Sequence, residues 1–218
     1  MVIVGVCGAS GSGKSTLAER IRDSLSCTCT IIGQDCYYKS FPDIPFADRC
    51  HLNYDDPEIF DYDEMLADLH TLSEGKAITK KGYDYPRHLR ADSEELIDPP
   101  DVLIIEGIHI FYDARIREMM SLKVYMHVDT DICLLRRIHR DMKSRGRSIE
   151  SISEQYLSTV KPMYEKYIQH YIKEADFAIM RGGHNIMAID AISAYLTTKV
   201  LAERFARDKA LSENSEKC

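Results

Sequence analysis

The sequence predicts a three-layer α/β protein in which helices cover both faces of a mostly parallel central sheet. Short apolar runs alternate along the chain with segments of helical length, and polar residues follow the ends of most apolar runs. The first run leads through a glycine-rich loop into a helix. Because ligands of such sheets gather at the carboxyl ends of the strands, we expect one pocket to collect these polar residues.

The order of the elements supports this prediction. We expect strands over residues 2–7, 30–33, 102–105, 122–128 and 177–180, and helices over residues 15–25, 131–143, 153–171 and 186–207. Residues 36–100 differ from the rest, being rich in Tyr, Asp, Pro and His, with strand-like pieces on either side of Lys80-Lys81-Gly82. We interpret this stretch as an insertion, in the form of a small hairpin, that covers the pocket.

The length of 218 residues suits one substantial core better than two independent ones. We therefore predict a single domain over residues 1–210, which includes the insertion at 36–100 and an arginine-rich lid region at 136–156. Residues 211–218 are polar, and we expect them to form a disordered tail.

Composition excludes several classes of protein. The net charge of −7 argues against a general binder of nucleic acids or anionic membranes, and no uncharged apolar run approaches membrane-spanning length. The N-terminus lacks a basic leader, and the seven cysteines are scattered without zinc-type spacing. We expect a cytoplasmic protein with reduced thiols, no membrane partner and no nucleic acid.

The glycine-rich loop matches G-x-x-x-x-G-K-[S/T], the phosphate-binding loop of P-loop NTPases, between a predicted strand and a predicted helix. Its backbone N–H groups are expected to surround the phosphates, while Lys14 reaches the β- and γ-phosphates and the Ser15 hydroxyl binds Mg²⁺. The expected ATP contacts are Gly8, Ala9, Ser10, Gly11, Ser12, Gly13, Lys14, Ser15 and Thr16. The chain shows no NKxD-type guanine signature, which favours ATP over GTP without deciding between them.

Two acids just beyond strand ends are candidates for phosphoryl transfer, which needs a metal ion and a group that takes the acceptor's proton. Glu106 follows the apolar run at 102–105 and should hold Mg²⁺ directly or through water. Asp35 could orient or deprotonate an incoming hydroxyl, and we group it with Ser15 and Glu106 as a possible metal ligand. For each acid, the alternative is one that merely ends a strand.

Arginines and lysines crowd into residues 136–147 against an acidic background. Arg137 and Arg140 share a helical face, while Arg145-Gly146-Arg147 is expected to leave the helix as a mobile flap. Such a flap would bring arginines over the triphosphate and neutralise charge in the transition state. The alternative is a solvated helix face, as in most charge runs.

Together these residues identify a resemblance to the uridine kinases (uridine-cytidine kinases) of the phosphoribulokinase-like P-loop group. The similarity runs from Ile3 to about Leu196. Its segments include GASGSGKST at 8–16, QDCYY at 34–38, NYDDPEIFD at 53–61, YDYPRHLR at 83–90, IIEGI at 104–108 and RRIHRDMKSRGRSIESISEQY at 136–156. The residues at 36, 86 and 89 depart from the usual pattern, which leaves fine substrate preference open.

The resemblance implies a P-loop kinase that transfers the γ-phosphate of ATP to the 5′-hydroxyl of uridine or cytidine, with Asp35 as catalytic base and Ser15 and Glu106 at Mg²⁺. It places Lys14, Arg140 and Arg145 at the phosphates. The implied nucleoside-binding residues are Asp55, Tyr83, His88, Arg137, Arg147 and Gln155, with Tyr54 and Tyr85 packing on the rings. On residue type alone, the stretch around His88 suits a surface hairpin better than a base pocket. A homotetramer, a role in pyrimidine salvage and feedback by pyrimidine nucleoside triphosphates are further implications.

Two alternatives remain open from the sequence. The first is a related kinase acting on pantothenate, a phosphorylated ribulose or nicotinamide riboside. The second is a nucleotide-dependent switch ATPase, in which ATP binding changes a protein interface. The relative preference for uridine and cytidine is not encoded in any motif we recognise.

Overall fold

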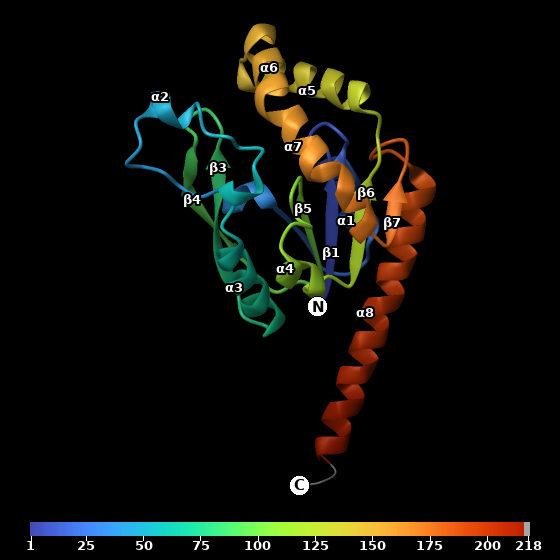
Figure 1. Ribbon diagram of the computed structural model, residues 1–218. Coiled ribbons are helices and arrows are strands. Elements are labelled where there is room, and N and C mark those ends of the chain that lie inside the picture. The colour runs from blue at the N-terminus through green and yellow to red at the C-terminus, as the bar shows by residue number, and fades with distance from the viewer. Residues whose placement is uncertain (216–218) are drawn as a thin grey trace.

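A computed structural model describes residues 1–215 and contains a five-stranded parallel sheet with strand order β2-β5-β1-β6-β7 (Figure 1). The strands are β1 (Val2–Gly8), β2 (Cys29–Gly33), β5 (Val102–Gly107), β6 (Leu122–Met126) and β7 (Phe177–Ile179). Their sequences are mostly apolar, with many Val and Ile residues, and suit strands that are covered on both faces. The predicted α/β fold with a mostly parallel sheet is confirmed.

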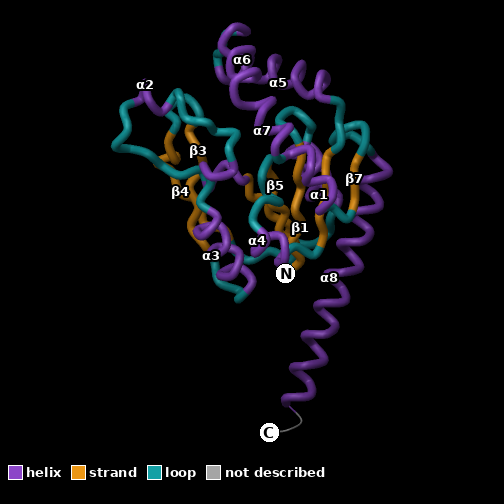
Figure 2. Tube along the Cα trace, in the orientation of Figure 1, coloured by secondary structure: helices purple, strands orange, loops and turns teal. Residues whose placement is uncertain are grey.

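Alternate residues of β1 serve two separate cores. Val2, Val4 and Val6 pack under α1 (Lys14–Ser24) and α8 (Ile186–Ser215). Ile3 and Cys7 face the opposite core, which is filled by α3 (Tyr62–Ser73), α4 (Ala114–Met119) and the 3₁₀ segment Ile168–Glu174. The three layers visible in Figure 2 follow from this period-two alternation.

The insertion is more structured than the sequence indicated. It holds a 3₁₀ turn (Gln34–Tyr37) at its start, then α2 (Phe46–Arg49), a second 3₁₀ turn (Pro57–Ile59), α3, and the antiparallel pair β3 (Ile78–Asp84) and β4 (Leu89–Ile97). Helix α3 was not predicted, although its buried residues Met65, Leu69 and Leu72 have helical spacing.

The predicted hairpin exists, but its turn lies elsewhere. Strand β3 runs through Lys80-Lys81-Gly82, and the chain reverses at residues 85–88. Lys80 stays inside the strand because its buried ammonium group pairs with Glu64 at 2.8 Å and Asp68 at 2.9 Å on α3. A lysine that the sequence analysis placed in the turn of the hairpin is therefore a buried ion-pair partner.

The segment above the sheet begins with α5 (Thr130–Arg145), as predicted, and Gly146 ends that helix in the left-handed conformation with φ 62°. The single helix expected over residues 153–171 is instead broken into α6 (Ile149–Gln155), a π-helical turn (Tyr156–Val160), α7 (Lys161–Lys166) and the 3₁₀ segment. Pro162 stands at the start of α7 and cannot donate a backbone hydrogen bond to the preceding turn, which accounts for the wider π turn before it.

The C-terminal helix corrects a second expectation. Helix α8 continues to Ser215 and extends beyond the body of the molecule (Figure 1), so residues 211–215 are helical where a disordered tail was predicted. Residues 201–211, just before and at the start of that segment, are rich in Glu, Arg, Lys, Ala and Leu, which all favour helix. The last three residues of that prediction, 216–218, lie outside the described residues. No helix within residues 1–215 is both long and apolar enough to cross a membrane.

Candidate active site

One cavity of about 1000 Å³ opens at the carboxyl ends of the strands, between the β3–β4 hairpin and the segment formed by α5, α6 and the π turn. Every residue predicted for the site lines this cavity except Gly8, Ala9 and Ser12. Gly8 packs against Met126 and Ser12 is fully buried. These residues therefore shape the phosphate loop from behind, while its other members face the cavity.

The phosphate loop depends on glycines in the left-handed region. Gly11 has φ 85° and Gly13 has φ 94°, and a Cβ atom at Gly11 would lie 2.3 Å from the Cys133 carbonyl oxygen. The loop leads into α1, whose N-terminus faces the cavity with its unpaired backbone N–H groups. Lys14 begins this helix and donates to the Ala9 carbonyl oxygen at 2.9 Å, which brings its ammonium group back over the loop. The arrangement is suited to binding a polyphosphate.

The oxygens of Ser15 and Glu106 meet at the start of α1 and the end of β5. The Ser15 hydroxyl donates to Glu106 Oε1 at 2.8 Å. Neighbouring ligands of an octahedral Mg²⁺ with bonds near 2.1 Å lie about 3 Å apart, so both oxygens are spaced to enter one coordination shell. Within residues 1–215, no group of three or more His, Cys, Asp or Glu side chains could hold a metal ion. Ser15 and Glu106, with Asp35 in the same cavity, are the residues that fit Mg²⁺ bound together with phosphates and water.

Asp35 lies in the 3₁₀ turn after β2, where it accepts a hydrogen bond from the Tyr85 hydroxyl of the hairpin turn. Burial and the nearby Asp35 carboxylate raise the pKa of Tyr85, so the phenol keeps its proton and remains a donor. The Arg145 guanidinium lies 4.0 Å from the centre of the Tyr85 ring. Asp35 is thus the point where the sheet, the hairpin and the arginine-rich segment meet.

Asp55 lines the same cavity and is almost fully buried. Burial raises the pKa of its carboxyl group, while Arg137 at 3.8 Å and a hydrogen bond of 3.2 Å from the Thr159 hydroxyl oppose that rise. Its backbone carbonyl oxygen contacts His109 Nε2 at 2.7 Å. Burial lowers the pKa of His109 to about 4, so the ring is neutral; Nε2–H donates to Asp55, and Nδ1 accepts from the Tyr171 hydroxyl at 2.9 Å.

Aromatic rings form the wall next to Asp55. His88 stacks on Tyr54 with ring centres 4.8 Å apart, and Tyr38 packs on Tyr83 at 4.7 Å. Burial and then Arg147 lower the pKa of His88, which keeps its imidazole neutral with one donor and one acceptor. A planar heterocycle with a polar edge fits such a wall.

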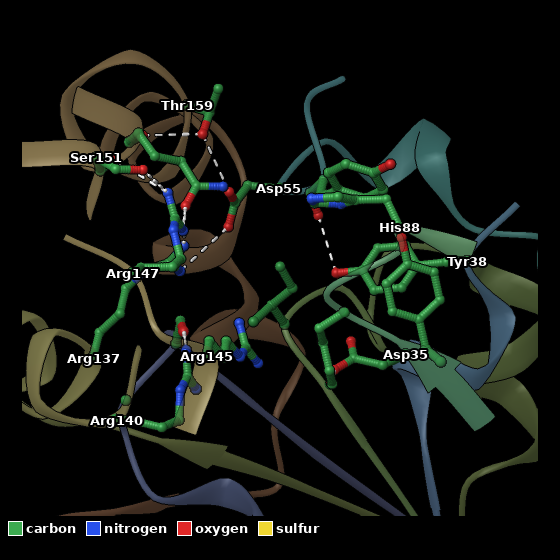
Figure 3. A pocket seen from close by; sticks show the side chains of 18 of the residues that line it. Asp35, Tyr38, Asp55, His88, Arg137, Arg140, Arg145, Arg147, Ser151 and Thr159 are labelled. Atoms are coloured by element: carbon green, nitrogen blue, oxygen red, sulfur yellow. Dashed lines mark hydrogen bonds and ion pairs between the residues drawn. The ribbon is translucent and has the colours of Figure 1, made fainter. Parts of the chain in front are cut away.

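The arginines enter from the other side of the cavity, opposite Asp35, Tyr38 and His88 (Figure 3). Arg137 and Arg147 both donate to Gln155 Oε1, the former at 2.9 Å. Arg137 is only 6% exposed, so it does not belong to a solvated helix face. Arg140 reaches the phosphate loop through a 3.4 Å hydrogen bond to the Ser10 hydroxyl.

The sequence analysis did not identify several residues of the site. Tyr38 and Thr159 line the cavity, His109 supports Asp55 from behind, and Asp141 lies among the arginines. The signal for Asp141 was visible, since it is the single acid within residues 136–147. Thr159 gave no signal, because its contact with Asp55 spans 104 residues of chain.

Comparisons with known proteins agree with this geometry. The profile of the Phosphoribulokinase / Uridine kinase family matches residues 3–188. A uridine kinase of Limosilactobacillus reuteri is 45% identical over 193 residues, covering 88% of each chain, and a uridine kinase of Geobacillus kaustophilus is 41% identical, covering 90% of this chain and 94% of its own. The solved structure of the phosphoribulokinase from Rhodobacter spheroides superposes with a TM-score of 0.61 at 19% identity, over 82% of this chain and 69% of that one, which shows the shared fold.

The match to the family profile runs from residue 3 to residue 188 and therefore spans the phosphate loop, the hairpin and the arginine-rich segment. The elements that build the cavity are therefore the elements that the match spans. This chain belongs to the phosphoribulokinase/uridine kinase family.

Proposed function

We propose that this protein is an ATP-dependent kinase that transfers the γ-phosphate of ATP to the 5′-hydroxyl of uridine or cytidine, giving UMP or CMP. The observation that carries the proposal is the position of Asp35, which lies in one cavity with the phosphate loop and with the Asp55 and His88 side. A carboxylate placed between a polyphosphate site and a ring pocket is suited to accept the proton of a ribose hydroxyl. The bacterial relatives named uridine kinase support the choice of acceptor.

The remaining residues have separate roles in the proposed reaction. Lys14, Arg140 and Arg145 would neutralise charge on the phosphates as the bond to the leaving oxygen breaks. Asp55 and Arg137 offer a carboxylate and a guanidinium to the sugar hydroxyls, and His88 offers its neutral imidazole to the edge of the base. Ser15 and Glu106 would hold Mg²⁺, which would supply positive charge next to the phosphates.

An acceptor panel tests the proposal directly. The protein is incubated with ATP and Mg²⁺ together with uridine, cytidine, pantothenate, ribulose 5-phosphate or nicotinamide riboside, and the product is identified by mass spectrometry. We expect UMP and CMP, and no phosphorylation of 5′-deoxyuridine, which lacks the acceptor hydroxyl but should still compete with uridine. Turnover of another acceptor with uridine and cytidine inert would contradict the proposal.

The switch ATPase is separated by the reaction without acceptor. A kinase consumes ATP quickly only when its acceptor is bound, so we expect ATP to be consumed slowly until uridine is added. Rapid hydrolysis of ATP alone would favour the switch. No described feature of the structure favours that alternative over transfer.

Three properties implied by the family resemblance stay proposals: Mg²⁺ as the metal ion, a homotetramer, and a cytoplasmic role in pyrimidine salvage. Omission of Mg²⁺ from the assay and addition of a chelator should abolish transfer. Size-exclusion chromatography with light scattering should give four times the mass of one chain, which is 25.0 kDa.

A further inference from the structure

We infer that Asp141 is a positioning residue whose two carboxylate oxygens direct two pairs of arginines toward the two different substrates. The inference rests on the proposed function, because it takes the phosphate loop and the Asp55 side as the two substrate sites. Asp141 lies on α5, and its side chain is fully buried. Four arginines surround this one acid, each within 4.0 Å.

The oxygen Oδ1 faces the arginines of the phosphate side. Arg140 Nε donates to it at 2.8 Å, and Arg145 Nη1 lies 3.5 Å away. Because Asp141 takes the Nε–H of Arg140, the outer nitrogens of that guanidinium remain free, and Nη2 reaches the Ser10 hydroxyl of the phosphate loop. Oδ1 thereby aims the terminal edge of Arg140 at the site of the triphosphate.

The oxygen Oδ2 faces the arginines of the acceptor side. Arg137 Nε lies 3.6 Å from it, and Arg147 Nη1 lies 3.9 Å from it. The outer nitrogens of Arg137 then point away from Asp141, one to Gln155 at 2.9 Å and the other toward Asp55 at 3.8 Å. The same carboxylate therefore aims a second guanidinium at the proposed ribose site.

The two carboxylate oxygens of Asp141 differ in how closely the arginines approach them. Oδ1 accepts a short hydrogen bond, whereas Oδ2 is buried and accepts none from the described residues. Buried polar atoms without a partner are uncommon, and here the nearest donors are the acceptor-side arginines. We expect this looser side to close when a nucleoside binds Arg137 and orders it.

The inference separates orientation from simple charge balance. If Asp141 served only to offset positive charge, its loss would weaken folding without changing how the folded enzyme binds either substrate. If it orients both pairs, one substitution should impair the use of two substrates that occupy different ends of the cavity. Misplacement of such groups by about 1 Å costs about 100-fold in rate.

The experiment compares Asp141→Asn and Asp141→Glu with the wild type. We expect Asp141→Asn to raise KM for both ATP and uridine and to lower kcat/KM on the order of 100-fold per folded enzyme, with the folded fraction measured by circular dichroism. Asp141→Glu keeps the charge but moves both oxygens by one methylene, and it should also lose activity. Asp131→Asn, an equal change of charge on an exposed residue of α5, is the matched control and should leave both KM values unchanged.

Calorimetric titration of Mg-ADP and of uridine, each alone, completes the test. Both affinities should fall in Asp141→Asn, and if that variant does not fold, the same measurements on Asp141→Glu decide. Unchanged affinities in a folded Asp141→Asn, or wild-type activity in Asp141→Glu, would overturn the inference. A wild-type protein that binds Mg-ADP but not uridine would instead refute the proposed acceptor, while the effect of Asp141 on Mg-ADP binding would still be measured.

Discussion

The phosphate side and the acceptor side of this cavity are built in different ways. The phosphate side is built on one continuous stretch, residues 8–16, whose geometry comes from left-handed glycines and the start of one helix, and α5 adds Arg140 and Arg145 to it. The acceptor side combines residues 54–55 and 83–88 with Arg137, Arg147 and residues 155–159, which come from the insertion, the hairpin and the segment above the sheet. One side is therefore a local backbone motif, and the other is a constellation of side chains held by buried charges.

This difference determines what a substitution can do. Backbone N–H groups of the phosphate loop do not depend on the identity of most side chains, so the loop tolerates change outside its glycines, Lys14 and Ser15. The acceptor side depends on pairs such as Asp55 and Arg137, in which the loss of one partner removes an ion pair from the other, which stays buried. We expect changes on one side to alter the use of one substrate. Changes at Asp35, which lies at the junction of the two sides, should alter phosphoryl transfer itself.

The largest effect is expected at the junction, from Asp35→Asn. The amide cannot accept the proton of the attacking hydroxyl, and we expect kcat to fall on the order of 10²- to 10⁴-fold. Binding of Mg-ATP, measured by calorimetry, should be nearly unchanged because the phosphate loop is intact. Asp43→Asn, an exposed acid of the insertion, is the control and should keep full activity. Normal turnover in Asp35→Asn would remove Asp35 from the role of base.

The same comparison explains how much could be predicted from sequence. The strands, α1, α5 and the phosphate loop follow from patterns within about fifteen residues, and the structure confirms these elements. Glu106 and Asp35 were found because strand ends mark the edge where ligands gather. These are statements about local sequence.

The rest could not be derived in this way, because it depends on contacts between distant segments. Lys80 is buried because α3 supplies Glu64 and Asp68 as its partners. This pairing keeps Lys80 inside β3, so the turn lies further along the chain than predicted. The residues of the acceptor side were predicted from a family resemblance, because the sequence spacing of His88 and Asp55 does not distinguish them from surface residues. Thr159 and His109 were missed for the same reason.

The second largest effect concerns stability in acid and is expected from His109, beneath Asp55. Its pKa in the folded protein is about 4, whereas in the unfolded chain it is about 6.5. Between these values the unfolded chain binds a proton that the folded protein does not, so the free energy of unfolding falls as pH falls from 6.5 to 4. The loss at the lower end is about 3 kcal/mol.

Denaturant titrations across this range measure the prediction. In His109→Gln the titrating ring is absent, so the fall in stability between pH 6.5 and pH 4 should be smaller than in the wild type by about 3 kcal/mol. His70→Gln, at an exposed position, should follow the wild type. An equal fall in both variants would show that His109 does not titrate in this way.

A third, smaller effect is expected from His88→Ala on the acceptor side. The substitution removes the stacking on Tyr54 and one hydrogen-bonding edge, together about 2 kcal/mol, or about 30-fold in kcat/KM for uridine. KM for ATP should stay the same, because the phosphate loop makes no use of His88. His70→Ala serves as control, and equal losses for both substrates would place His88 outside the base pocket.

The lowered pKa of His88 adds a dependence on pH. Burial and then Arg147 lower the pKa of His88 below the ordinary histidine value of 6.5, so the imidazole is mostly neutral at that pH. As pH falls from 8 to 6.5, uridine use should therefore show no loss due to His88, and the loss should begin only below that value. A decline that starts above pH 7 and is absent in His88→Ala would contradict this assignment.

The smallest effect, and the finest test of the comparison, is expected from Thr159→Val. Valine keeps the shape of threonine but cannot donate the 3.2 Å hydrogen bond to Asp55, which should cost about 1 kcal/mol and lower kcat/KM for uridine about fivefold. The same hydroxyl proton is shared with the carbonyl oxygen of the residue four positions earlier, at 3.1 Å, so the substitution also removes a contact within the helix. Thr198→Val controls for this, because Thr198 makes the same bond on the exposed face of α8, at 3.0 Å, and contacts no substrate site. A fall in kcat/KM for uridine in Thr159→Val alone would show that the Thr159 hydroxyl helps to position Asp55. Equal kcat/KM values in the two variants would show that Arg137 positions Asp55 without it.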